Sequence, residues 1–263
     1  MIESNVILTI LREIFRGITQ SLNIIKLSML IYKNVNLQKN MFKLFKHNLI
    51  LYILPAFIMI LINIPFNYFY YLYVIIDTFS GFFHLLYYFD ISNTIINSIP
   101  SKRKIHDTDP MTNGLTMTLY QLTTIITIGI IDFTIGLFNV KFSYVIKFFL
   151  LSMYHAIFVH NNLWQNMGLS ITVRIDIYQK MWPYYLGYGI IPSILYMQSN
   201  ILIKGIYNIY IGILISISML NRAVLPTSKI VIPKISLKFI EYMMVLIYGT
   251  VSYCVVNILN IIN

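Results

Sequence analysis

The sequence predicts an all-α integral membrane protein, a helical bundle with kinked spans and a helical hairpin that penetrates the bilayer fully or half-way. Of its 263 residues, 58% are hydrophobic and only 11% are charged, and the mean hydropathy is +0.73. An ordinary soluble domain carries about 25% charged residues, so this chain has too few polar groups to cover a soluble monomer. Several apolar stretches also reach the roughly 20 residues that a helix needs to cross a bilayer.

The composition excludes several other classes of protein. Disorder requires low hydrophobicity, and a disulfide scaffold requires more than the single Cys254. The net charge of +10 would suggest nucleic acid as the partner of a soluble domain. In a membrane protein the same excess is typical of cytoplasmic loops, which anionic headgroups attract by about 1 kcal/mol per basic residue. We therefore predict a lipid bilayer with anionic headgroups as a partner, and no nucleic acid.

The N-terminal region, 1–46, is predicted to be amphipathic and basic, ahead of a single membrane domain at 47–263 with about five to six membrane helices. No cleavable signal peptide is expected, because the first stretch is charged. The charged residues are Glu3, Arg12, Glu13 and Arg16. Over 6–32, apolar residues recur at helical spacing, which predicts one amphipathic helix. Such a helix packs on the protein or lies among the headgroups.

Two helices are predicted in the first half of the membrane domain. Residues 49–76 carry no charged side chain, and Pro55 and Pro65 predict a kinked first span at about 49–70. A second helix is predicted over about 74–98. It carries Asp77, His84 and Asp90.

The next pair of spans follows the most polar stretch of the chain, a loop at 101–110. A third span is predicted over about 113–138, with Asp132 near its end, and a fourth over about 142–164. The segment 165–182 is more polar and separates this pair from the last apolar region.

Residues 184–221 predict a helical hairpin. This stretch is apolar apart from Lys204, too long for one span and just long enough for two short ones. Its middle carries the polar residues Gln198, Ser199 and Asn200. Backbone that turns at membrane depth has to be covered by protein or water. A last apolar helix is predicted over about 237–261.

The distribution of basic residues predicts the orientation of these segments. Basic residues cluster before residue 47 and at 102–104, 174–180 and 222–238. The positive-inside rule places all four clusters on the cytoplasmic side, so the 184–221 hairpin has to return to the side that it left. The final helix would then leave the C-terminus on the far side.

No pattern in the sequence predicts an enzyme, a metal site or a bound cofactor. Paired cysteines, phosphate-binding loops and the known hydrolase and zinc signatures are missing from the sequence. His155 and His160 lie five positions apart, which on a helix directs them about 140° away from each other. We therefore predict no catalytic residue.

Ionisable residues in the predicted membrane segments remain as candidates, because they are costly in lipid and mark functional sites. Lys204, Arg174 and Asp132 are the candidates for a polar path. A plain structural interpretation stays open beside this one. An aspartate near a helix end can reach headgroups or cap a turn, and the stem of Lys204 can extend to the interface.

The run Met181–Pro192 (MWPYYLGYGIIP) resembles the signature of the etoposide-induced protein 2.4 family, multi-pass membrane proteins of the endoplasmic reticulum grouped with the bacterial sulfate permease CysZ. The matching positions are Trp182, Pro183, Tyr184, Tyr185, Gly187 and Gly189, followed by Gln198 and Ser199. Upstream, LWQNMG at 163–168, with Trp164, and YYFDIS at 87–92, with Asp90, are similar to further elements of the family. Asn161 and Leu163 depart from it, since they replace charged residues.

The signature also has a physical interpretation. Trp182, Tyr184 and Tyr185 are amphipathic rings suited to the headgroup level. Pro183 fits the first turn of a helix. Glycines at 187 and 189 allow another helix to approach closely.

The resemblance implies a non-enzymatic scaffold or adaptor in the endoplasmic-reticulum membrane, linked to autophagy and organelle organisation, with cytoplasmic protein partners at 1–46 and 101–110. The alternative, from the bacterial relatives, is a passive permease for sulfate-type anions that works as a homo-oligomer. A respiratory subunit is a third hypothesis that composition alone suggests. It would need a charged relay across several spans, which the scattered charges Asp77, Asp90, Asp132 and Lys204 do not supply.

Overall fold

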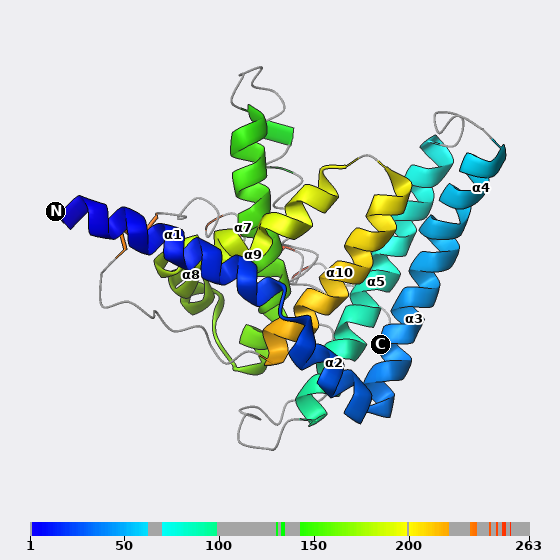
Figure 1. The fold of residues 1–263 in the computed structure, drawn as a ribbon, viewed down its shortest axis with the longest axis horizontal. Coiled ribbons are helices and arrows are strands. Elements are labelled where there is room, and N and C mark those ends of the chain that lie inside the picture. Colours follow the sequence, from blue (N-terminus) through cyan, green and yellow to red (C-terminus); the bar gives the residue numbers. More distant parts are fainter. Residues whose placement is uncertain are drawn as a thin grey trace. The chain divides into compact units, whose positions relative to one another are not determined.

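The structure is a computed structural model that describes residues 2–62, 70–98, 130, 133–134, 143–198, 200–220, 232–235, 242, 246, 249–250 and 253. Side chains are described in these ranges except at 2–5, 70–79, 82 and 171. All regular secondary structure in this part of the chain is helical (Figure 1), as the composition predicts.

Two compact units make up the fold. Unit 1 comprises Met1–Gln20, Lys102–Ile190 and Ala223–Asn263, and unit 2 comprises Ser21–Ser101 and Ile191–Arg222. The first division along the chain falls between residues 20 and 21. Each unit is built from segments that lie far apart in the sequence.

Unit 2 is a bundle of long helices. Helix α3 (Val35–Asn48), the π-helical turn η1 (Leu49–Ile53) and helix α4 (Leu54–Ile62) follow one another without a break. Helices α5 (Tyr70–Ser98) and α10 (Ile201–Leu220) pack against each other and against α3, and the short α2 (Ile24–Lys33) packs on α3 and α10 (Figure 1). The predicted helix at 74–98 is confirmed as α5.

The first predicted span begins earlier than expected. We predicted it to begin at about 49, but helix continues from Val35 to Ile62, so three lysines of the N-terminal region lie on it. The irregularity expected at Pro55 is the π-turn just before it, where the Leu54 N–H donates to the carbonyl of Leu49. A proline ring clashes with the carbonyl four residues earlier, and a π-turn inserted into the ladder is one way in which a helix accommodates such a disturbance. Pro65 lies outside the described residues.

Small residues bring α10 close to its neighbours in unit 2. A Cβ at Gly212 would lie 2.4 Å from Leu44 Cδ2, and a Cβ at Gly205 would lie 2.8 Å from Tyr52 Cβ. The side chains of Leu44 and Tyr52 are fully buried there. Glycine thus makes room for large buried side chains of the continuous helix Val35–Ile62.

The prediction of a single amphipathic helix over 6–32 is wrong, because this region forms two helices. Helix α1 (Ile2–Ser21) ends before a tight turn, and α2 begins at Ile24. The Ile24 N–H donates to the Leu22 carbonyl at 2.7 Å, and Asn23 has φ −77° and ψ 65°. These are the dihedrals of an inverse γ-turn, which apolar periodicity does not reveal.

Unit 1 contains α1, α7 (Ser143–Asn166), α8 (Ile171–Lys180) and the first part of α9 (Trp182–Tyr196). The helix predicted over 142–164 is confirmed as α7. That helix ends in a Schellman motif: Gly168, at φ 69°, donates to the Gln165 carbonyl, and Leu169 donates to that of Trp164. Ser170 then accepts a hydrogen bond from the Val173 N–H and caps α8.

Among the residues that the structure describes, three helices are long and apolar enough to cross a membrane: Val35–Ile62, Ser143–Asn166 and Ile201–Leu220. The break predicted within 184–221 is present, since α9 ends at Tyr196 and α10 begins at Ile201. The two arms differ in length, 15 residues against 20, so α10 could cross on its own. The predicted loop at 101–110 lies outside the described residues, as do most of the expected helices at 113–138 and 237–261.

Candidate functional site

The signature residues form the start of α9 in unit 1. The helix begins at Trp182, directly after the C-cap of α8 at Met181. Pro183 is therefore the second helical residue, where its missing N–H leaves no helical bond unmade. The predicted role of this proline as part of a helix start is confirmed.

The two signature glycines contact two different helices. A Cβ at Gly187 would lie 2.0 Å from the Ile14 carbonyl oxygen of α1, and a Cβ at Gly17 of α1 would lie 2.1 Å from the Tyr184 oxygen. A Cβ at Gly189 would lie 1.7 Å from the Ser152 oxygen of α7. Separations below 3 Å leave no room for a side chain. The close helix approach predicted for these glycines is therefore confirmed, with α1 on one side and α7 on the other.

The signature tyrosines are not at an exposed belt, which corrects the interpretation of Tyr184 and Tyr185 as headgroup-level rings. Tyr184, Tyr185 and Tyr188 are fully buried in the protein. Trp182 alone is half-buried, and its Nε1–H donates to the Pro233 carbonyl at 3.1 Å. A pattern of aromatic residues at a helix start fits both locations, so sequence could not distinguish them.

A buried imidazole, His160 of α7, lies at the centre of these rings. Its ring centroid is 4.6 Å from that of Tyr188, 5.1 Å from that of Tyr185 and 5.8 Å from that of Trp164. Its Nδ1 is 2.8 Å from the Ala156 carbonyl, so Nδ1 carries the proton and donates. The structure thus brings together the predicted residues Trp164 and Tyr185, whose centroids are 5.6 Å apart. From the sequence we considered His160 only as a possible metal ligand and did not predict its packing among these rings.

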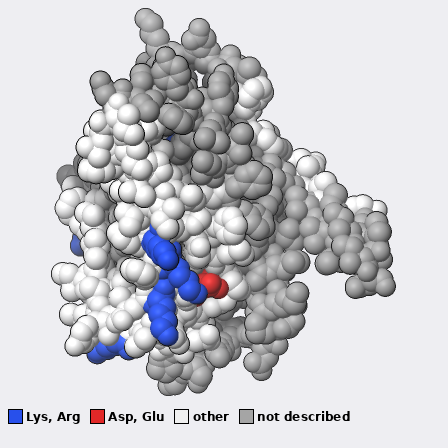
Figure 2. Space-filling model, turned by 90° about the vertical axis from the view of Figure 1, so that its right-hand side faces the viewer, with Lys and Arg blue, Asp and Glu red and all other residues white. Residues whose placement is uncertain are grey.

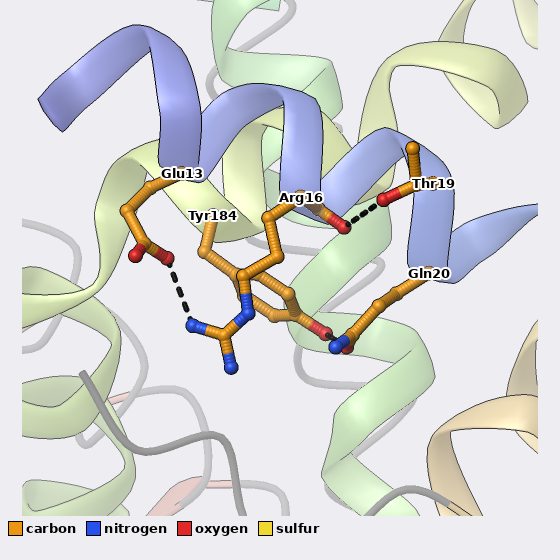
Figure 3. Close-up of polar contacts among 5 residues, drawn as sticks. All are labelled: Glu13, Arg16, Thr19, Gln20 and Tyr184. Atoms are coloured by element: carbon orange, nitrogen blue, oxygen red, sulfur yellow. Dashed lines mark hydrogen bonds and ion pairs between the residues drawn. The ribbon is translucent and has the colours of Figure 1, made fainter. Parts of the chain in front are cut away.

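A polar network fills the contact between α1 and α9 (Figure 3). Glu13 is only 2% exposed and forms an ion pair with Arg16. The Arg16 guanidinium donates a hydrogen bond to Glu13 Oε2, with Nη1 and Oε2 3.0 Å apart. The Arg16 guanidinium lies 5.5 Å from the centre of the Tyr184 ring, within cation–π range. The hydroxyl of Tyr184 donates to Gln20 Oε1 at 2.7 Å. The charged and polar face of α1 therefore points into unit 1.

The candidates for a polar path that the structure describes belong to different units. Arg174, on α8 in unit 1, is buried, and its guanidinium donates to Asn161 Oδ1 at 2.6 Å and to the Leu169 carbonyl at 2.7 Å. Lys204 is half-buried on α10 in unit 2. Asp132 lies outside the described residues. Asn161, which departs from the family pattern, is thus the acceptor for Arg174.

The other predicted motif residues lie in unit 2 or outside the description. Asp90 is exposed on α5, and its backbone carbonyl accepts a hydrogen bond from the Thr94 hydroxyl. Gln198 is exposed in the turn before α10, and Ser199 lies outside the described residues. None of these contacts gives Asp90 or Gln198 a chemical role.

Unit 2 holds a second polar cluster that sequence reasoning missed, between α3 and α5. Ser80 Oγ lies 3.0 Å from His47 Nε2 and 3.4 Å from His84 Nδ1, and His84 Nε2 lies 3.0 Å from Asn48 Oδ1. The amide of Asn48 then donates to the carbonyl of Leu44. Spacing on single helices could not reveal the cluster, because it joins residues more than 30 positions apart. In the part of the chain that the structure describes, no three His, Cys, Asp or Glu side chains group as metal ligands do.

Asp176 joins two basic segments on the surface of unit 1. Its carboxylate accepts from Lys180 Nζ and from Lys234 Nζ, both at 2.6 Å. The hydrogen bond from Lys180, and then that from Lys234, lowers the pKa of Asp176. Residues 58 positions apart in the sequence therefore meet on one carboxylate.

Replacing Asp176 with asparagine is expected to lower the free energy of unfolding by less than about 1 kcal/mol at neutral pH, because exposed ion pairs are screened. The folded pKa lies below the unfolded one, so the contribution is present above the unfolded pKa and is lost as pH falls through the folded pKa. Denaturant unfolding of both proteins at neutral and at strongly acidic pH measures this. A difference that persists in acid would contradict the assignment.

Comparison with known proteins identifies a relative that is similar over nearly the full length. The chain is 33% identical to the uncharacterized protein L211 of Acanthamoeba polyphaga mimivirus over 264 aligned positions, which cover 98% of this chain and 99% of that protein. The similarity therefore extends over the whole of both sequences. No family model matches the chain, and no solved structure matches it.

Proposed function

This chain belongs to the same family as the uncharacterized protein L211 of Acanthamoeba polyphaga mimivirus, and we propose that it is a multi-pass membrane protein of the endoplasmic reticulum that acts as a scaffold rather than as an enzyme. The membrane part of this proposal follows from side-chain polarity. The scaffold part follows from the resemblance to the etoposide-induced protein 2.4 family and from the exposed basic surface of unit 2.

One observation carries the membrane proposal, the inverted polarity of the helix Val35–Ile62. The apolar side chains near its end face outward, with exposures of 56% at Phe57, 69% at Ile60 and 67% at Leu61. The polar Asn48, on the same helix, is fully buried and hydrogen-bonded. A soluble protein arranges these groups the other way round. Hydrocarbon favours an apolar exterior with satisfied polar groups inside.

Contacts on the surface of unit 1 support the prediction that the 184–221 hairpin returns to the side of the membrane that it left. Lys180 precedes the α9–α10 segment and Lys234 follows it, yet both contact Asp176. Trp182, the first residue of α9, also bonds to Pro233. The contact of these two segments at one exposed carboxylate supports their location on one side of the membrane, as the positive-inside rule predicts for their basic residues.

Single-cysteine labelling tests this prediction. In a Cys254→Ser background, Lys180→Cys and Lys234→Cys are expected to react with a membrane-impermeant maleimide from the same side of sealed vesicles. Labelling from opposite sides would contradict the returning hairpin. Lys33→Cys, on exposed α2, serves as the reference for the cytoplasmic side that the charge pattern predicts.

The scaffold proposal rests on a basic surface that faces outward. Helix α3 carries three exposed lysines at helical spacing, Lys39, Lys43 and Lys46. Figure 2 shows the side of the molecule that lies to the right in Figure 1, where basic side chains gather with an acidic one beside them. Such a surface suits anionic headgroups or an acidic protein partner.

Localisation tests the scaffold proposal directly. A fluorescently tagged full-length chain is expected to overlap with an endoplasmic-reticulum marker. Lys39→Glu with Lys43→Glu should weaken the capture of partners while leaving the location unchanged. Exclusive localisation to the mitochondrial inner membrane would refute the proposal and favour the respiratory hypothesis.

A second candidate, an anion permease, is favoured by one observation: the cationic Arg174 is held inside unit 1. Cations inside a membrane protein are costly and often serve transport. Sulfate flux into liposomes that hold the purified protein tests it, with Lys204→Ala as the comparison. Flux no greater than that of empty vesicles would remove this candidate.

A further inference from the structure

Helix α1 exposes a continuous apolar face. Four large side chains occupy it, at spacings that place them on one side of the helix. They are Ile7 (60% exposed), Leu8 (67%), Leu11 (57%) and Phe15 (67%). Contact with water at this face would be unfavourable, by about 25 cal/mol for each Å² of apolar surface left exposed.

The opposite face of α1 is the polar one, and it is buried. Thr9 and Glu13 are 7% and 2% exposed, and Gly17 lies against the backbone of α9. The ion pair from Glu13 to Arg16 and the bond from Tyr184 to Gln20 hold this face in place (Figure 3). The helix therefore cannot rotate its apolar side inward without breaking those contacts.

The charges of α1 indicate what covers the apolar face. Glu13, its acidic residue among the described side chains, points inward and is paired. Arg12 is exposed and, four positions after Leu8 on the helix, lies beside the apolar face. The outward surface thus combines apolar and basic groups and lacks exposed acid among these residues. This combination is complementary to an anionic lipid surface.

We propose that α1 lies in the plane of an anionic phospholipid bilayer, with Leu8, Leu11 and Phe15 in the boundary between headgroups and acyl chains and its polar face clamped on α9. The helix would tie the signature helix to the membrane surface. The inference rests on the proposed membrane location and is independent of the scaffold role, since it concerns how the fold contacts lipid.

Nitroxide labelling of the full-length protein in liposomes tests this. Leu11→Cys and Phe15→Cys, each in the Cys254→Ser background, are expected to collide readily with oxygen and rarely with a water-soluble nickel chelate, at a depth of about 5–10 Å. Lys180→Cys, on the exposed face of α8, should show the reverse. Two independent positions guard against a label that disturbs one of them.

Two other outcomes would overturn the proposal. High accessibility of both labels to nickel would place the face in water. Low accessibility to both reagents would place it against a protein surface, such as a second copy of the chain. A separate experiment tests the contribution of the basic residue Arg12. Phosphatidylserine in the vesicles should raise the accessibility of the nitroxides to oxygen, and Arg12→Glu should abolish this increase. An equal signal with and without phosphatidylserine would refute the anionic requirement.

Discussion

Alanine at Gly187 or at Gly189 is expected to destabilise the protein by about 1–3 kcal/mol, the usual effect of overpacking a core. The new methyl group would lie 2.0 Å from the Ile14 oxygen at one position and 1.7 Å from the Ser152 oxygen at the other. Both neighbours are backbone atoms, so no side chain can move aside and a whole helix has to shift. Loss of helical circular dichroism in a denaturant titration of the purified protein in detergent measures the effect.

Gly81 on α5 supplies the matched control. Nothing lies within 4 Å of a Cβ built there, so Gly81→Ala is expected to be neutral or stabilising by up to about 1 kcal/mol, because alanine favours helix. Equal stability of Gly187→Ala and Gly81→Ala would contradict the close crossing of α1 and α9.

The glycine contacts also predict which substitutions interact. Gly17 and Gly187 lie at one crossing, so the second alanine should cost much less than the first, because the helices have already moved apart. Gly189 faces α7 instead. Its effect should combine with that of Gly17 more nearly additively.

Residues within single helices explain most of what the sequence predicted correctly. The extent of α5 and α7 follows from long apolar stretches, and the break near Gln198 follows from a polar interruption. The close contacts of Gly187 and Gly189 follow from their missing side chains. These features depend on residues that are close together in the sequence, so sequence patterns are sufficient to predict them.

The features that were missed depend on contacts between segments. Tyr184 and Tyr185 looked interfacial, yet they are buried because α1 and α7 cover them. The amphipathic pattern of α1 predicted a helix but not which face is covered, and its polar face proved to be the inner one. The cluster of His47 and His84 joins two helices through Ser80. No single-helix pattern carries that information.

Methionine at Arg174 is expected to destabilise unit 1 by about 1.5–3 kcal/mol, the range for a lost hydrogen bond to a charged group. The substitution keeps much of the apolar stem but removes the donors to Asn161 Oδ1 and to the Leu169 carbonyl. Arg174→Lys should not restore stability, because a single ammonium group does not reproduce the planar guanidinium fork. Denaturant unfolding followed by the fluorescence of Trp164 and Trp182, both in unit 1, measures the change.

A double-mutant cycle separates the bond from general packing. Asn161→Leu combined with Arg174→Met should cost less than the sum of the two single changes, because neither polar partner is then left buried alone. Lys180→Met, an exposed position on the same helix, should change stability by less than about 1 kcal/mol. If Arg174→Met kept full stability but removed anion flux, Arg174 would serve transport rather than the turn between α7 and α8. The buried bonds to Asn161 Oδ1 and to the Leu169 carbonyl favour the structural role, since they tie α8 to α7 and to the turn between the two helices.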